Sequence, residues 1–174
     1  VARTLPRAVA LESNSTSKTL ERVNDLLLLD SQKGFFVTIV YAIINPKSGQ
    51  IRYSNAGHNP PYLISEKAKK IEILKSSGIA LGAMPNINLS EHEMTLWEGD
   101  SLIFYTDGVT EAIDNLGEFY GNRRFVKVLN SLIGENANAI NDQVEKNLNE
   151  FRNGAPYSDD TTLLAIRRLP LLTN

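Results

Sequence analysis

Two acidic turns carry the side chains in this sequence that are best suited to binding a metal ion. The first, Thr106-Asp107-Gly108, directly follows the run Leu102–Tyr105, whose apolar and aromatic residues predict a buried strand. The second, Ser158-Asp159-Asp160-Thr161, lies near the carboxy-terminal end. Hard divalent cations such as Mg²⁺ and Mn²⁺ prefer carboxylate oxygens. The candidate ligands are therefore the aspartates of the two turns, Asp107, Asp159 and Asp160.

Each of these aspartates also has a plain structural interpretation. Asp-Gly is a common turn dipeptide, and on local grounds a turn at Asp107-Gly108 is about as well supported as a metal ligand. The pair Asp159-Asp160 could equally cap a turn. Only their proximity in space would favour a metal site, and that requires the strand before Asp107 and a strand after Asp160 to be neighbours in one sheet.

Two further polar residues are weaker candidates for a role in chemistry. His58, in Ala56-Gly57-His58, could bind phosphate or orient a catalytic group, but a structural hydrogen-bonding role is the commoner one for such a histidine. Glu111, four residues after Asp107, could contact water on a metal ion, or could be solvated or cap a helix. His92 falls in a predicted exposed strand and is given no role.

The composition is that of an ordinary globular protein and excludes several classes of function. The chain has 174 residues, of which 42% are hydrophobic and 22% charged, enough for one domain with a hydrophobic core. The formal charge of −2 gives no electrostatic reason to expect nucleic acid or an anionic membrane as a partner. The absence of cysteine excludes disulfides, thiolate metal sites and a cysteine nucleophile, and favours a cytoplasmic location.

The sequence shows no motif for membrane insertion, secretion or nucleotide binding. No apolar run approaches the roughly 20 residues that span a bilayer, and no signal peptide is visible. No nucleophile-elbow serine, Gly-x-Gly-x-x-Gly loop or Walker sequence occurs, so nucleotide binding through those loops is unsupported.

Hydrophobic periodicity predicts helices, then a run of antiparallel strands, then two helices and a last strand. This order favours an α+β fold over alternating βαβ units. A short helical turn is predicted to begin within 109–112. Helices are expected over 1–11, about 17–30, 123–133 and roughly 140–151, and strands over 35–44, 50–54, 62–65, 70–74, 92–97, 101–105 and 161–166.

Taken in order, several segments resemble the SpoIIE/RsbU-type bacterial serine phosphatases of the metal-dependent protein phosphatase (PPM) superfamily. The match runs from about residue 20 to residue 168. It is specific as a set, although each motif alone is weak. The segments are Phe36-Val37-Thr38, Ser54-Asn55-Ala56-Gly57-His58-Asn59-Pro60-Pro61, Leu81-Gly82, the stretch from Gly99 to Ala112, Gly117-Glu118-Phe119-Tyr120-Gly121 and Asp159-Asp160-Thr161-Thr162-Leu163.

The resemblance implies a four-layer α-β-β-α sandwich of two antiparallel sheets with a binuclear Mn²⁺ or Mg²⁺ centre. In this family, water held between the two ions attacks phosphoserine or phosphothreonine directly. By position, Asp107 and Asp159 match metal-binding aspartates, and Asp159 is favoured over Asp160. The implied substrate is a phosphorylated anti-sigma-factor antagonist of the STAS type in a partner-switching pathway. Oligomeric state is left open, with a homodimer among the states allowed.

One departure from the family pattern is serious. Two earlier acidic motifs, a Gly-Asp segment with a nearby Asp and a Gly-Asp-x-x-Gly-x-Gly segment, do not occur in this sequence. Val1-Ala2-Arg3-Thr4 resembles the helix that follows the second motif. Residues 1–174 are therefore expected to be the carboxy-terminal portion of one SpoIIE-like domain, with about half of a metal site. The alternative is a catalytically inactive phosphatase fold that binds a regulatory partner.

Overall fold

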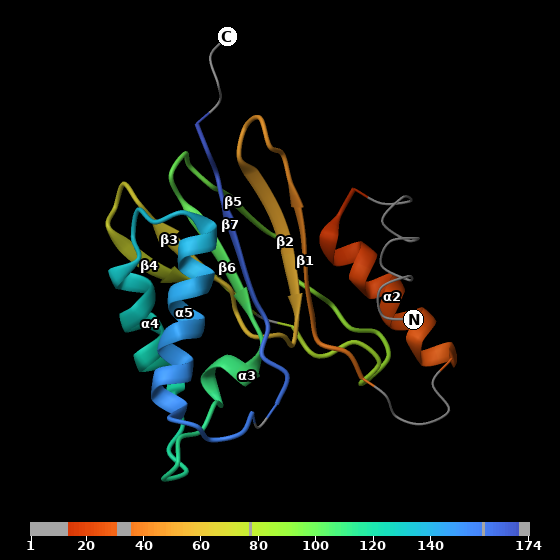
Figure 1. Ribbon diagram of the computed structural model, residues 1–174. Coiled ribbons are helices and arrows are strands. Elements are labelled where there is room, and N and C mark those ends of the chain that lie inside the picture. The colour runs from red at the N-terminus through yellow and green to blue at the C-terminus, as the bar shows by residue number, and fades with distance from the viewer. Residues whose placement is uncertain (1–13, 31–35, 77, 158, 171–174) are drawn as a thin grey trace. The chain divides into compact units, whose positions relative to one another are not determined.

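The computed structural model describes residues 14–30, 36–76, 78–157 and 159–170 (Figure 1). These residues divide into two compact units. The first comprises the described parts of Val1–His58 together with Lys75–Thr95, and the second those of Asn59–Leu74 and Leu96–Asn174. In the part of the chain so described, no helix has both the length and the apolar character needed to cross a membrane.

The first unit is an antiparallel sheet packed against one helix. Strands β1 (Ile39–Ile44), β2 (Gln50–Ala56) and β5 (His92–Thr95) pair in the order β1-β2-β5, and helix α2 (Thr16–Asp30) packs against β1 and β2. A small apolar core joins helix and sheet, because α2 places its apolar residues on one face. Its buried members are Leu20, Val23, Ala56, Leu81 and Leu89.

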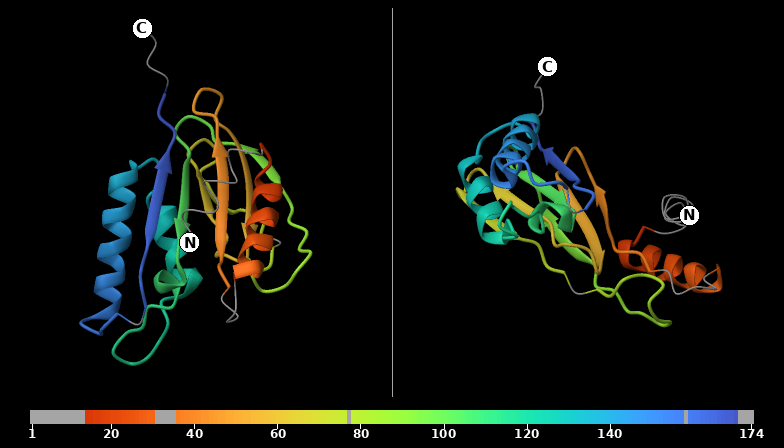
Figure 2. Two further views of the ribbon diagram at one scale, coloured as in Figure 1. Left: turned by 90° about the vertical axis from the view of Figure 1, so that its right-hand side faces the viewer. Right: turned by 60° about the horizontal axis from the view of Figure 1, so that its bottom comes forward.

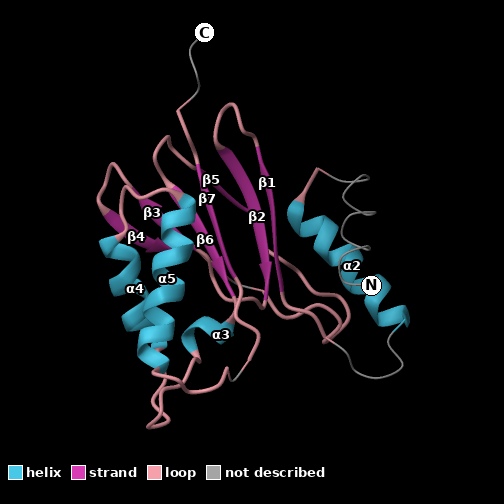
Figure 3. Cartoon of the chain, in the orientation of Figure 1, coloured by secondary structure: helices cyan, strands magenta, loops and turns pink. Residues whose placement is uncertain are grey.

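The second unit holds both acidic turns. Its sheet, whose strands are magenta in Figure 3, has the order β4-β3-β6-β7 and is fully antiparallel. Helix α5 lies alongside β7 in both views of Figure 2. The strands are β3 (Tyr62–Ser65), β4 (Lys70–Ile73), β6 (Ser101–Tyr105) and β7 (Leu163–Arg167), and the helices are α3 (Asp107–Thr110), α4 (Gly121–Ser131) and α5 (Ala137–Arg152).

Helix α5 is defined by clear signals at both ends. The Asn136 side chain accepts a hydrogen bond from the backbone N–H of Ala139 at 2.9 Å, which is a regular N-cap. Asn153 adopts a left-handed conformation, with φ of 46°, and ends the helix. Between these ends, the stripe Ile140, Val144 and Leu148 is buried in the core of the unit and holds the helix on the sheet.

The predicted α+β class with two antiparallel sheets is confirmed, and each predicted element within the described residues is present. The predicted helix over 1–11 lies outside those residues. Some boundaries differ: β1 begins at Ile39, because Val37 exchanges both backbone hydrogen bonds with Leu81, at 2.8 and 2.9 Å, instead of pairing with β2. The helical turn after β6 begins at Asp107, two residues earlier than predicted.

Candidate metal site

The pairing of β6 with β7 brings the two acidic turns together. These strands are antiparallel neighbours, and the last pair in their register is Tyr105 opposite Leu163. The chain beyond that pair leads directly to Asp107 on one side and back to Asp160 and Asp159 on the other. The strands β6 and β7 are therefore neighbours in one sheet, as the predicted metal site requires.

Hydrogen bonds from two threonines fasten the turns to each other. The Thr106 hydroxyl donates to the backbone carbonyl of Asp160 at 3.0 Å and accepts from the backbone N–H of Thr162 at 2.9 Å. The Thr161 hydroxyl donates to the carbonyl of Gly108 at 3.2 Å. The backbone of each turn is thus held by a side chain of the other, which fixes the spacing between them.

Gly108 is the point of closest approach between the turns. A Cβ atom at this position would lie 2.5 Å from the carbonyl oxygen of Asp160 and 3.1 Å from the Thr161 hydroxyl oxygen. The first distance is far below van der Waals contact, so only glycine permits this approach of two backbones. The Asp-Gly pair is therefore needed for packing against the second turn, whatever the aspartate binds.

Asp107 and Asp159 both place exposed carboxylates at this junction. Asp107 is the first residue of α3, and its Oδ1 accepts a hydrogen bond from the N–H of Gly108 at 3.1 Å. In the other turn, Oδ1 of Asp159 accepts from the N–H of Asp160 at 2.7 Å. One oxygen of each carboxylate is thus oriented by the backbone of its own turn. Asp160, also exposed, contributes its backbone carbonyl to the bond with Thr106.

This arrangement fits part of a site for a hard divalent cation. Exposed carboxylates on a fixed backbone are suitable ligands for Mg²⁺ or Mn²⁺. Within the described residues, however, no group of three or more His, Cys, Asp or Glu side chains could hold a metal ion. The chain as described therefore offers fewer ligands than a binuclear centre requires.

His58 is held by hydrogen bonds that favour its structural interpretation. Its backbone N–H donates to Oδ1 of Asn55 at 2.8 Å, and its carbonyl accepts from Nδ2 of Asn55 at 2.9 Å. Its ring Nδ1 lies 3.1 Å from the Thr38 hydroxyl. His92, for which no role was predicted, packs against Tyr53, with 5.3 Å between the two ring centroids. Glu111 follows α3, and its N–H donates to the Asp107 carbonyl at 2.7 Å.

A contact between Tyr157 and Arg152, just before the second acidic turn, was not indicated by any sequence motif. The Tyr157 ring stacks over the Arg152 guanidinium, whose carbon lies 3.4 Å from the ring centroid. The Tyr157 hydroxyl also donates to Oδ1 of Asn149 at 3.2 Å. These contacts fix the segment between α5 and the second acidic turn. Their only sequence signal is an aromatic residue five positions after the final arginine of a helix.

The sequence from residue 1 to residue 169 matches the family model described as stage II sporulation protein E (SpoIIE). The chain belongs to this family. The resemblance to SpoIIE/RsbU-type phosphatase domains that the motifs indicated is thereby confirmed.

Two curated relatives are considerably longer than this SpoIIE family member. It is 32% identical over 133 residues to Protein IcfG from Synechocystis sp., a match covering 76% of this chain and 21% of IcfG. It is 26% identical over 152 residues to phosphoserine phosphatase RsbU from Bacillus subtilis, covering 87% of this chain and 45% of RsbU. The chain thus spans less than half the length of either relative.

Solved structures share the fold of this SpoIIE family member at low sequence identity. The RsbU and RsbW domains of Rv1364c from Mycobacterium tuberculosis match with a TM-score of 0.73 and 23% identity, over 96% of this chain and 46% of that one. The SiaA-PP2C domain of Pseudomonas aeruginosa matches with a TM-score of 0.76 and 20% identity, over 94% and 67% of the two chains. The SpoIIE phosphatase domain of Bacillus subtilis, presoaked with Mn, gives a TM-score of 0.68 at 18% identity, over 98% and 74%.

Proposed function

We propose that this SpoIIE domain is the carboxy-terminal part of a metal-dependent phosphatase acting on phosphoserine or phosphothreonine in proteins. The observation that carries the proposal is the β6–β7 pairing, which brings the turns of Asp107 and Asp159 together in a chain that belongs to the SpoIIE family. The name of the Bacillus subtilis relative, a phosphoserine phosphatase, supports the same reaction class.

In this proposal Asp107 and Asp159 hold Mn²⁺ or Mg²⁺, and the surrounding residues set their positions. When bound, such ions supply a nucleophilic water at neutral pH and neutralise phosphoryl oxygens. Thr106 and Gly108 keep the two carboxylates at a fixed spacing. Thr106 does so through its hydrogen bond to the second turn, and Gly108 through its close backbone contact with Asp160. In the proposal, the remaining ligands come from outside the described residues, and residues 1–174 are the carboxy-terminal portion of one phosphatase domain.

The proposed substrate is a phosphorylated protein of the STAS type within a cytoplasmic partner-switching pathway. Support comes from the relative named RsbU and from a structural neighbour in which RsbU and RsbW domains occur in one chain. The near-neutral formal charge of −2 agrees with a protein partner rather than nucleic acid.

A second candidate is an inactive phosphatase fold that binds a regulatory partner. The observation in its favour is that the described residues contain no group of three metal-ligating side chains. Reading the gene upstream of the codon for Val1 separates the two candidates. Finding the two further acidic motifs there supports the enzyme, and a parent protein without them supports the binding module.

The decisive experiment measures dephosphorylation of a phosphorylated STAS protein by the parent protein in the presence of Mn²⁺. Asp107→Asn and Asp159→Asn are each expected to reduce the rate by about 100-fold or more, because each removes a ligand charge. Asp25→Asn, which changes an exposed aspartate on α2, is the matched control and should retain full activity. Undiminished hydrolysis by Asp107→Asn would show that the metal assignment is wrong.

The isolated 174-residue chain provides a complementary test. Because its described residues offer few ligands, we expect weak Mn²⁺ binding and little hydrolysis on its own. Calorimetric titration checks this directly, and two tight sites per chain would contradict it.

A further inference from the structure

A cavity of about 510 Å³ lies between α5 and the segment that leads into the second acidic turn. It reaches the turn of the proposed metal site, because Asp159 and Asp160 both line it. Its surface combines apolar and acidic side chains with amide, hydroxyl and aromatic ones. The apolar lining residues are Val144, Leu148 and Leu163, and the acidic ones are Glu145, Asp159 and Asp160.

The floor of the cavity is apolar and rigid. Val144 and Leu148 belong to the buried stripe of α5, with exposed fractions of 0% and 6%, and Leu163 is the half-buried first residue of β7. Since these side chains are packed into the core, the floor can receive a hydrocarbon chain without rearranging.

The rim of the cavity is acidic. Glu145, Asp159 and Asp160 are exposed, and none of the lining residues is a lysine or arginine. Among the described residues, none of these three carboxylates is in an ion pair. Because Asp159 is assigned to the metal ion, Glu145 and Asp160 are the rim charges that face a substrate side chain. The rim therefore attracts a cation.

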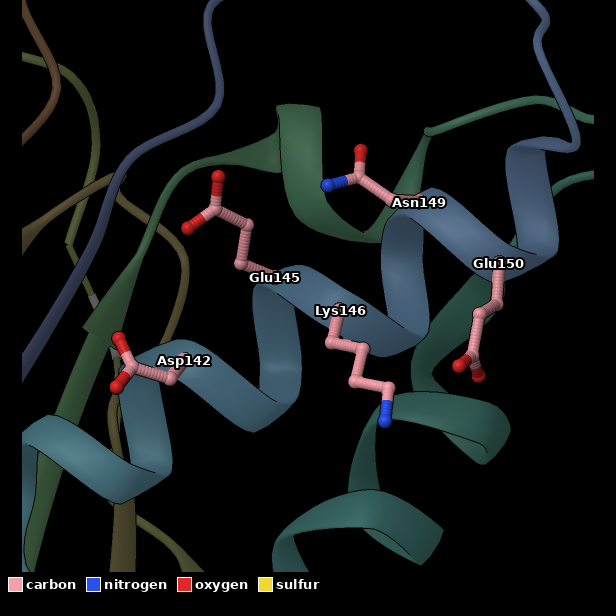
Figure 4. Close-up of a pocket in the computed structure, with 5 residues that line it drawn as sticks. All are labelled: Asp142, Glu145, Lys146, Asn149 and Glu150. Atoms are coloured by element: carbon pink, nitrogen blue, oxygen red, sulfur yellow. The ribbon is translucent and has the colours of Figure 1, made fainter.

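The neighbouring surface of α5 continues this charge distribution (Figure 4). Asp142, Glu145 and Asn149 project to one side of the helix, whereas Lys146 and Glu150 point to the other. The single lysine of this surface is thus directed away from Glu145. Tyr157 also lines the cavity, and its position is fixed by its stacking on Arg152 and its bond to Asn149, both residues of α5.

We propose that this groove binds a lysine or arginine side chain of the phosphoprotein substrate, close in sequence to the phosphorylated residue. The inference rests on the proposed function, because it places the phosphate at the adjacent turn of Asp107 and Asp159. A long basic side chain has a hydrocarbon stem and a charged end, which match the apolar floor and acidic rim. The shared residue Asp159 limits the separation to a few residues, since an extended peptide advances about 3.3 Å per residue.

Binding is tested first without any turnover. Two unphosphorylated, fluorescein-labelled peptides differing only in lysine or norleucine at one position are titrated into the parent protein without added metal. Anisotropy should show about fivefold tighter binding of the lysine peptide, in the range of one exposed ion pair. Glu145→Gln should remove this preference, whereas Glu150→Gln, on the other side of α5, should keep it.

Several results would overturn the proposal. Equal affinity of the wild-type chain for both peptides is one, and an unchanged lysine preference in Glu145→Gln is another. Displacement of the lysine peptide by free spermidine at equal concentration would mark a general cation site and not a docking groove. Tyr157→Phe, which keeps the ring and loses the bond to Asn149, should retain the preference, and Tyr157→Ala should weaken binding of both peptides.

Hydrolysis by the parent protein separates this proposal from the proposed function. With phosphoserine versions of the two peptides and Mn²⁺, we expect a KM about fivefold lower for the lysine peptide. Hydrolysis that depends on Asp107 but shows no lysine preference would support the proposed phosphatase function and contradict lysine binding in the groove. A lysine preference in binding, with no hydrolysis of either peptide, would support the groove and refute the phosphatase.

Discussion

The Thr106 hydroxyl donates a hydrogen bond to the backbone carbonyl of Asp160 at 3.0 Å, so one short side chain joins the two acidic turns. The same oxygen accepts from the N–H of Thr162 at 2.9 Å. Thr106→Val keeps the size and β-branching of the side chain and removes both bonds. We expect it to lower the free energy of unfolding by about 1 kcal/mol.

If Asp107 and Asp159 share a metal centre, Thr106→Val should also reduce hydrolysis by the parent protein about tenfold. Thr106→Ser, which keeps the hydroxyl, is the matched control and should stay within about twofold of the wild-type rate. Urea denaturation gives the stability and initial rates give the activity. If the valine variant is as active as the serine variant, the hydrogen bonds of the Thr106 hydroxyl do not position the carboxylates.

Gly108→Ala should separate the turns, because its Cβ would lie 2.5 Å from the Asp160 carbonyl oxygen. The contact is with backbone, which cannot move aside as a side chain could. We expect a loss of about 1–3 kcal/mol in the free energy of unfolding and a parallel loss of Mn²⁺-dependent activity in the parent protein.

The control is Gly134→Ala, at a glycine with φ of 96° and no atom within 4 Å of the added Cβ. This change strains the backbone far from the turns, so it should cost about 1 kcal/mol of stability and leave activity unchanged. Equal activity losses in the two variants would mean that general destabilisation, not the spacing of the turns, is responsible.

The parts of the fold that could be predicted from the sequence are those with local signals. The apolar run Leu102–Tyr105 became β6, and the stripe Ile140, Val144 and Leu148 became the buried face of α5. The strand predicted over 161–166 begins instead at Leu163. Thr161 and Thr162 are of a residue type that favours strands. However, the Thr161 hydroxyl donates to the Gly108 carbonyl and the Thr162 N–H donates to the Thr106 hydroxyl.

Long-range contacts explain what was not predicted. The early start of α3 at Asp107 follows from its carbonyl, which accepts the N–H of Glu111 at 2.7 Å, and a turn at Asp-Gly gives no local sign of that bond. The groove beside α5 depends on Tyr157 stacking over Arg152 in a segment without periodicity. Such contacts are set by tertiary packing, which a local pattern does not encode.

Glu91 gives the fold of the first unit a defined pH dependence. Its carboxylate accepts hydrogen bonds from the backbone N–H of Thr16, the Thr16 hydroxyl at 2.7 Å and the Ser15 hydroxyl at 3.1 Å, and so caps the start of α2. Burial acts to raise the pKa of Glu91, but these bonds and the charge of Arg52 outweigh it, and the pKa lies below its ordinary value of 4.5.

A pKa lowered by folding means that ionised Glu91 stabilises the folded state at any pH above the ordinary value of 4.5. That contribution is lost as the pH falls through the folded value. The free energy of unfolding of the wild type should exceed that of Glu91→Gln by about 1 kcal/mol near pH 7, and the difference should shrink as the pH falls below the ordinary pKa of 4.5. Glu93→Gln, at an exposed glutamate of β5, is the control and should show no such gap. Urea denaturation across this pH range measures the difference, and a gap that persists in acid would contradict the capping role.

Asp100 anchors the entrance to β6 from a position that is 1% exposed. Its Oδ1 accepts the N–H of Glu66 at 3.0 Å and its Oδ2 the N–H of Trp97 at 3.1 Å, so the carboxylate joins the end of β3 to the turn before β6. In Asp100→Asn an amide NH₂ would face one of these N–H groups, and one buried donor would lose its acceptor. We expect a loss of about 1–3 kcal/mol in urea denaturation. The exposed substitution Asp25→Asn should change stability by less than about 0.5 kcal/mol. An equally small effect at Asp100 would show that the two N–H groups find other acceptors, and that the acidic residue before β6 is not needed to hold the strand that leads to Asp107.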